Sequence, residues 1–161
     1  MLRLSMVEFV ARAIPEAFLL VFAIYTFSNT RINRKNYLIS SLLMVGMIFI
    51  IRSLPISYGI HTILSIMVLI LLSYFVNGID VMKSGKSTII TIIIQLICEG
   101  ANIFIIQHIF KKDMNYIFKD PRLKTIYGIP SLIIFGCIII LFYIKLLKRK
   151  EIKYDQRRNS I

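Results

Sequence analysis

Charged side chains stand inside long apolar stretches of this 161-residue chain, where charge is costly. In the first stretch Glu8, Arg12 and Glu16 follow one another at intervals of four residues. Such positions share one face of a helix, so the arginine can pair with a carboxylate one turn to either side. A charge at the bilayer centre costs at least ~2.5 kcal/mol. A structural interpretation is that Arg12 only neutralises these carboxylates. A functional interpretation is that Glu16 belongs to a buried polar site.

A second polar set, Gln95, Glu99 and Asn102, repeats at i, i+4 and i+7 and again lies on one helical face. Glu99 is near the middle of its apolar stretch, where a carboxyl group must be neutral, paired or hydrated. Its candidate counter-charges are Arg12 and Arg52. Either a hydrogen-bonded helix contact or a ligand or ion site explains the pattern. The site hypothesis comprises Glu16, Glu99, Gln95, Asn102 and Arg12.

The residues beside Glu99 are small, and Gly100 and Ala101 would allow a close approach by another helix. Farther along the chain, Arg52 and His61 flank a turn that contains Pro55 and Gly59. These two side chains could bracket a pocket mouth at the extracellular surface. A tight turn anchored at the membrane interface would use the same residue types.

The residue pattern offers no support for catalysis, a bound metal or a cofactor. The run Ser84-Gly85-Lys86-Ser87-Thr88 resembles the end of a phosphate-binding loop, but Asp80 stands where that loop requires glycine. The residues His61, His108, Cys98 and Glu99 lack metal-ligand spacing. We therefore expect a protein that is not an enzyme, with no catalytic residues and no metal site.

Five apolar stretches must position these side chains: residues 7–27, 37–51, 60–76, 88–110 and 126–147. A mean hydropathy of +0.76 with 57% hydrophobic residues is too apolar for a soluble fold of this size. The stretches lack two-residue alternation, and lipid favours helices that satisfy their own backbone. The sequence predicts an all-α integral membrane protein with five transmembrane helices and short loops. Its membrane domain spans 1–148, and a re-entrant hairpin around 52–61 with three full spans is the alternative.

The net charge of +12 lies in the connections and the tail, as expected around membrane spans and not for nucleic-acid binding. Twelve basic residues fall on the tail side against seven on the other side, which places the N-terminus outside and the C-terminus in the cytoplasm of a cell-membrane protein. The short basic tail, 149–161, should attract anionic lipid. Cys98 and Cys137 fit small core residues better than a disulfide.

Several local motifs resemble those of one group of membrane proteins. They are Ile14-Pro15-Glu16, the Arg52-x-Leu-Pro-Ile-x-x-Gly-x-His-Thr62 turn, Cys98-Glu99-Gly100 and Tyr127-Gly-Ile-Pro130. The chain resembles small clostridial membrane proteins that are similar to the multi-span sensor region of GHKL-type (accessory-gene-regulator-like) sensor histidine kinases. The resemblance covers residues 7–148 and implies an input module without the kinase domain. Signals would pass to a separate sensor kinase or another membrane protein.

The residues and the resemblance together predict a sensor-like or accessory signalling module. It would bind a peptide, a small amphiphile or a membrane partner through the polar faces of the first and fourth spans. A small transporter or substrate-binding membrane subunit, with Glu16 and Glu99 coordinating a cation or substrate, is the alternative function.

Overall fold

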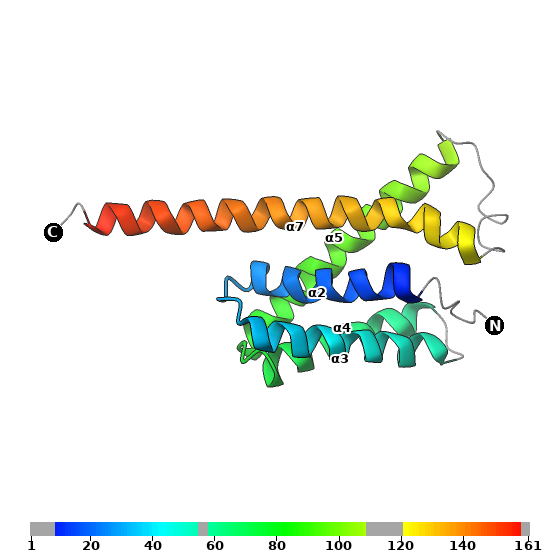
Figure 1. Cartoon of the computed structure of the whole chain (residues 1–161), viewed down its shortest axis with the longest axis horizontal. Coiled ribbons are helices and arrows are strands. Elements are labelled where there is room, and N and C mark those ends of the chain that lie inside the picture. The colour runs from blue at the N-terminus through cyan, green and yellow to red at the C-terminus, as the bar shows by residue number, and fades with distance from the viewer. Residues whose placement is uncertain (1–8, 55–57, 109–120, 159–161) are drawn as a thin grey trace.

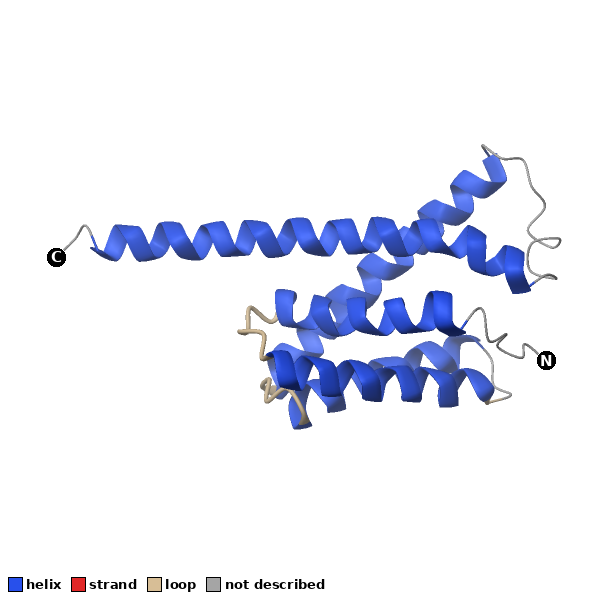
Figure 2. Ribbon diagram, in the orientation of Figure 1, coloured by secondary structure: helices blue, strands red, loops and turns tan. Residues whose placement is uncertain are grey.

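The computed structural model describes residues 9–54, 58–108 and 121–158, and within them every regular element is a helix (Figure 2). The elements are the π-helix η1 (Phe9–Ala13) and the α-helices α2 (Ile14–Phe27), α3 (Arg34–Ser53), α4 (Tyr58–Phe75), α5 (Val81–His108) and α7 (Pro121–Arg158). The all-α prediction is confirmed for this part of the chain.

Helix length and hydropathy support a multi-span membrane protein. Among the described residues three helical segments are long and apolar enough to cross a bilayer: Arg34–Ile51, Val81–His108 and Ile126–Lys148. A hydrocarbon core of ~30 Å requires about 20 helical residues. The apolar part of α4, Ile60–Phe75, is shorter, and α2 has 14 residues. Of the five predicted spans, three therefore meet this criterion by themselves.

The helices extend beyond the apolar stretches that predicted them. The helix α5 begins at Val81, not at residue 88, because small buried residues such as Ser84 and Ser87 pack its first turns against the bundle. The helix α7 begins at Pro121 and continues to Arg158, so residues 149–158 are helical and continue α7 beyond its apolar segment, Ile126–Lys148. Hydropathy marks the part of a helix that suits lipid, and not where its backbone hydrogen bonding ends.

Local sequence explains where several helices begin and end. The side chain of Asn33 accepts a hydrogen bond from the Lys35 backbone N–H at 3.2 Å and caps the start of α3. Pro15 stands in the first turn of α2, directly after the π-helix η1, and has no backbone N–H to donate to the preceding turn. Left-handed backbone at Asn29 (φ 55°) and Gly78 (φ 64°) follows α2 and α4, where these residue types are tolerated.

The helices α2, α3 and α4 lie side by side, and α5 packs against α2, α4 and α7 (Figure 1). Figure 1 also shows α7 running in the same direction as α2 and projecting well beyond the other helices at its C-terminal end. Residues of α2 fill much of the core, including Ala17, Leu20, Val21 and Ile24. Phe135 and Ile139 of α7 complete it.

The polarity of the surface and interior is that of a membrane protein. Large apolar side chains face outward, and Leu42, Phe75, Ile97 and Leu141 are each more than 60% exposed. Buried positions include the carboxylate residue Glu16, together with a set of hydroxyl residues. Lipid can solvate the apolar exterior, whereas buried polar groups need partners inside the bundle.

Candidate functional site

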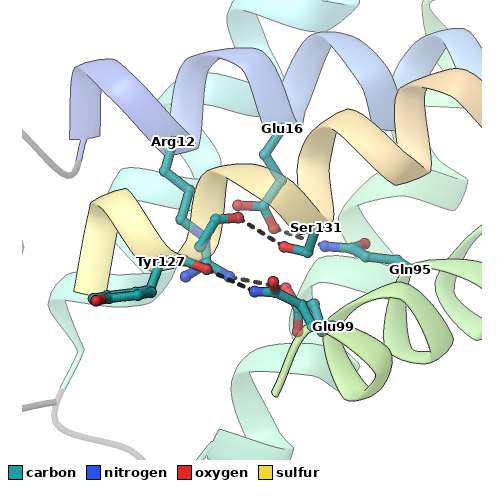
Figure 3. Close-up of polar contacts among 8 residues, drawn as sticks. Arg12, Glu16, Gln95, Glu99, Tyr127 and Ser131 are labelled. Carbon is teal, nitrogen blue, oxygen red and sulfur yellow. Dashed lines mark hydrogen bonds and ion pairs between the residues drawn. The ribbon is translucent and has the colours of Figure 1, made fainter. Parts of the chain in front are cut away.

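An ion pair between two helices forms the centre of the candidate site (Figure 3). The Nη2 of Arg12, at the end of η1, lies 2.9 Å from the Oε1 of Glu99 in the middle of α5. The two side chains keep 16% and 33% of their accessible surface, respectively. Of the two counter-charges expected for Glu99, the structure therefore places Arg12 beside it. The side chain of Arg52 lies outside the described residues.

A second contact between the same two parts of the bundle lies one turn away. Glu16 of α2 is 5% exposed, and its Oε1 accepts a hydrogen bond of 2.8 Å from the Nε2 of Gln95 on α5. Gln95 and Glu99 are four residues apart, so one face of α5 meets Arg12 and Glu16 together. The common face predicted for Gln95 and Glu99 thus points toward the first helix.

The third wall of the site comes from the beginning of α7. A Cβ atom on Gly128 would lie 2.9 Å from Nη1 and 3.2 Å from Cζ of Arg12, so the guanidinium rests directly against this glycine. One turn farther along α5, Asn102 donates a hydrogen bond of 2.6 Å from Nδ2 to the backbone carbonyl of Tyr127. Ser131 donates to the Gly128 carbonyl at 2.7 Å.

Pro130 lies inside α7 next to these contacts. Proline removes one backbone donor and bends a helix. Figure 1 shows the first turns of α7 set at an angle to the rest of the helix. The site therefore adjoins a bend in the longest helix.

The pairing predicted within the first span assumed one regular α-helix. Residues Phe9–Ala13 instead form a π-helix, whose wider turn changes the four-residue register on which that prediction depended. Arg12 reaches across to Glu99 on α5, and Glu16 accepts a hydrogen bond from Gln95. Glu8 lies outside the described residues.

The close helix approach that Gly100 and Ala101 would allow beside Glu99 is not made by the described residues. Gly100 and Ala101 are exposed, and no atom of another described helix lies within 4 Å of the place where a Gly100 Cβ would stand. The glycines that face a neighbouring side chain lie on α7: a Cβ on Gly128 would lie 2.9 Å from Arg12, and one on Gly136 would lie at an ordinary contact distance of 3.5 Å from Leu19. Their spacing of eight residues places both glycines on one helical face, a signal that sequence reasoning missed.

The other predicted residues stand apart from this site. His61 lies in the first turns of α4 and is half-buried. Its predicted partner across the turn, Arg52, has no described side chain, so the proposed pocket mouth stays a prediction. Cys98 is buried, Cys137 is exposed, and both are free thiols. Among the residues that the structure describes, no group of three potential ligands could hold a metal ion.

The arrangement joins two carboxylates, one guanidinium and two carboxamides at the meeting of η1, α2, α5 and α7. We call Arg12, Glu16, Gln95, Glu99 and Asn102 the polar cluster. It can donate and accept hydrogen bonds within an apolar bundle, and its formal charge is −1 with both carboxylates ionised. A scan of protein-family models finds no family that matches the chain, and searches of curated proteins and of solved structures find no match either.

Proposed function

We propose that this chain is a non-enzymatic, five-span signalling or accessory module of the cell membrane. In this proposal the polar cluster receives a small amphiphile, a peptide or a partner membrane protein. A separate polypeptide, such as a sensor kinase, reads the result at the cytoplasmic end. The apolar exterior and the partly exposed Arg12–Glu99 pair support a site that meets its ligand from the membrane or its surface.

One observation carries the signalling part of the proposal. The helix that touches Arg12 at Gly128 is also the helix that continues without interruption to Arg158. A ligand that moves the guanidinium would change its van der Waals contact with Gly128, which lies beside the bend at Pro130. A helix can transmit such a change along its length if it has two packing arrangements against its neighbours. The ligand must then bind one of these arrangements more tightly than the other.

The charge distribution supports a cytoplasmic position for the far end of α7. The end of α2 and the beginnings of α3 and α5 lie at one end of the bundle (Figure 1). Exposed basic residues occur in these segments and near the inner end of the apolar part of α7: Arg31, Arg34, Lys35, Lys83, Lys86, Lys145 and Lys148. Lysine and arginine favour the cytoplasmic side, where they also attract anionic lipid.

Cysteine labelling tests this orientation. Cysteines replacing Lys35 and Lys150 should be shielded from a membrane-impermeant thiol reagent in intact cells, whereas one replacing Asp120 should react. All three should react after the membrane is permeabilised. Reaction at position 150 in intact cells would contradict the orientation and any cytoplasmic partner of α7.

The coupling itself is tested by removing one charge and observing the other end of the molecule. A spin label at a cysteine replacing Lys148, in a Cys98→Ser/Cys137→Ser background, reports on α7 in nanodiscs. Glu99→Gln keeps the shape of the side chain but removes the charge that holds Arg12, so label mobility should change. Gln107→Glu, the reverse exchange at an exposed position of the same helix, should leave it unchanged. Identical spectra for Glu99→Gln and the parent would contradict the coupling.

A transporter remains the second candidate because α5 carries polar residues along most of its length. Its buried face carries Ser84, Ser87, Thr88, Thr91 and Asn102, with Gln95 and Glu99 on the same side. Eighteen residues of helix span about 27 Å, close to a hydrocarbon core. Purified chain in liposomes should show no cation or proton flux if it only senses, and flux lost in Glu99→Gln would favour the transporter.

A further inference from the structure

The C-terminal end of α7 continues as a helix beyond the part of the chain that suits lipid. Its apolar segment ends at Lys148, whereas the helix continues to Arg158 and projects past the rest of the bundle (Figure 1). At 1.5 Å per residue this extension adds about 15 Å along the helix axis. The headgroup layer on each side of the hydrocarbon core is about 5–7 Å thick. In the proposed orientation the last turns of α7 therefore lie in the cytoplasm.

This end of α7 carries a row of basic residues. Between Lys145 and Arg158 the sequence has seven basic residues and two acidic ones. Four of the basic residues follow one another at intervals of four: Lys145, Arg149, Lys153 and Arg157. Each interval turns about 40° around a helix, so the four positions cover about 120° and share one face. We call them the basic stripe, and Lys145 at its start is exposed.

The acidic residues of the same segment do not neutralise the stripe. No stripe position has Asp or Glu three or four residues away in the sequence, the spacings at which helical side chains meet. Glu151 instead follows Lys148 by three residues, and Asp155 precedes Arg158 by three. Like charges at i, i+4 destabilise a helix. The stripe is therefore a row of positive charge that an acidic partner would stabilise.

Anionic lipid accounts only for the beginning of the stripe. Lys145 and Arg149 fall on either side of Lys148, the end of the apolar segment, and so at headgroup level. Lys153 and Arg157 follow at about 7 Å and 13 Å beyond Lys148 along the axis. The attraction of a charged surface decays over about 8 Å at physiological ionic strength. The far half of the stripe therefore suits a protein better than lipid.

A second copy of the chain does not complement the stripe. In a two-fold symmetric pair the same face of each helix meets at the axis, so one stripe would meet the other and repel it. The two acidic positions, 151 and 155, lie on the opposite side of the helix. Two copies of α7 side by side cannot bring both acidic faces onto both stripes.

We infer that the projecting end of α7 docks an acidic helix of a cytoplasmic partner protein, whose carboxylates pair with the basic stripe. A helix suits the stripe because two helices side by side share the same repeat of about 6 Å per four residues. Charged residues along such a boundary set partner choice and orientation. This inference rests on the proposed function and names the chemistry of the polypeptide that reads α7.

A designed peptide tests the docking chemistry. The probe is a fluorescent, alanine-based helical peptide with glutamate at every fourth position, titrated with the full chain in phosphatidylcholine nanodiscs. Lys153→Gln/Arg157→Gln should weaken its binding by about tenfold, because two ion pairs are lost. The matched control, Lys148→Gln/Arg158→Gln, removes the same charge from outside the stripe and should weaken it by less than about threefold.

Exchanging the charges makes the test independent of overall attraction. Lys153→Glu/Arg157→Glu should reject the acidic peptide and bind a peptide with lysine in place of each glutamate. Lys148→Glu/Arg158→Glu, with the same net charge, should still prefer the acidic peptide. Equal losses in stripe and control variants would reduce the effect to net charge and overturn the inference, as would absence of binding to the parent chain.

A spin label distinguishes docking from adsorption to lipid. It is attached to a cysteine replacing Tyr154, in the Cys98→Ser/Cys137→Ser background, in nanodiscs of phosphatidylcholine alone or mixed with phosphatidylserine. A water-soluble relaxation agent should reach the label equally in both. Protection of the label in the mixed nanodiscs would place the end of α7 on anionic lipid and overturn the inference.

Failure of this inference is distinguishable from failure of the proposed function. Peptide binding combined with a label at position 148 that does not respond to Glu99→Gln would retain the docking surface and remove its coupling to the polar cluster. A responsive label without peptide binding would retain the coupling and overturn the acidic partner.

Discussion

The two ends of the helical bundle satisfy their buried polar groups in different ways. At the end where α2 begins, side chains bond between helices, as Arg12 does with Glu99 and Glu16 with Gln95. We call this the charged half. At the end where α2 terminates, several buried hydroxyls donate to carbonyls of their own helix, as Ser73 does to Leu69 O at 2.6 Å, whereas the Tyr25 and Thr88 hydroxyls have no partner among the described atoms. We call this the hydroxyl half, with Tyr25, Ser40, Ser41, Ser73, Ser84, Ser87, Thr88 and Thr91.

The difference concerns how much each half depends on a particular partner. A serine that bonds to its own helix stays satisfied when neighbouring helices shift, and its small size permits close packing. A guanidinium paired across helices loses its partner if either helix turns. Movement of one helix against another should therefore disturb the contacts of the charged half more than those of the hydroxyl half. Substitutions in the two halves should show this contrast.

The largest effect is expected from Arg12→Leu. It leaves the carboxylates of Glu99 and Glu16 without the cation on their side of the bundle. Removal of one member of a buried pair costs ~3–5 kcal/mol, and the one-third exposure of Glu99 reduces the expected loss to about 2–4 kcal/mol. The measurement is the free energy of unfolding in mixed micelles by denaturing-detergent titration.

A double-mutant cycle tests the origin of that loss. Glu99→Gln added to Arg12→Leu should recover more stability than Glu16→Gln added to it, because Glu99 forms the ion pair with Arg12. Stability of Arg12→Leu equal to that of the parent chain would mean that water already solvates these side chains.

An intermediate effect is expected at Gly128. A Cβ at this position would meet Arg12 at 2.9 Å, and the flexible arginine would move away from Glu99 to make room. We expect Gly128→Ala to lower the free energy of unfolding by about 1–2 kcal/mol, since the loss of a charge-assisted bond exceeds the gain in helix propensity. The measurement is again detergent titration.

Gly100→Ala is the matched control for this substitution. Its surroundings are open, so only the propensity gain of about 0.5–1 kcal/mol should remain, and the two glycines should respond with opposite signs. The same sign at both positions would show that Gly128 does not hold Arg12 in place.

The helices were predictable because a long apolar stretch in a membrane must satisfy its own backbone hydrogen bonds, and a helix does so within one segment. The faces of α5 were predictable too, since Gln95, Glu99 and Asn102 repeat at helical spacing. Which partners these side chains meet was not. That depends on the π-helix at Phe9–Ala13, which hydropathy does not reveal, and on the parallel packing of α2 and α7.

The glycines also show that the sequence did not reveal which residues contact one another. Gly100 beside Glu99 looked suited to a helix contact, yet it is exposed, while Gly128 and Gly136 make the contacts. A small residue permits close approach but does not specify which face turns inward. That choice follows from the whole set of buried side chains on a helix, and for α7 this includes Phe135 and Ile139.

The smallest changes in the free energy of unfolding are expected in the hydroxyl half, where the sign of the change is more informative than its magnitude. Thr88 and Thr91 are both fully buried on α5, but Thr91 donates to Ser87 O at 2.7 Å whereas the Thr88 Oγ1 has no partner among the described atoms. Thr88→Val replaces an unsatisfied hydroxyl with a methyl group and should stabilise the bundle by about 1 kcal/mol. Thr91→Val removes a satisfied bond and should destabilise it by about 0.5 kcal/mol. Detergent titration of both variants checks the signs. A marked loss of stability in Thr88→Val would show that this hydroxyl has a partner, such as an internal water molecule, and that the hydroxyl half also depends on contacts beyond its own helices.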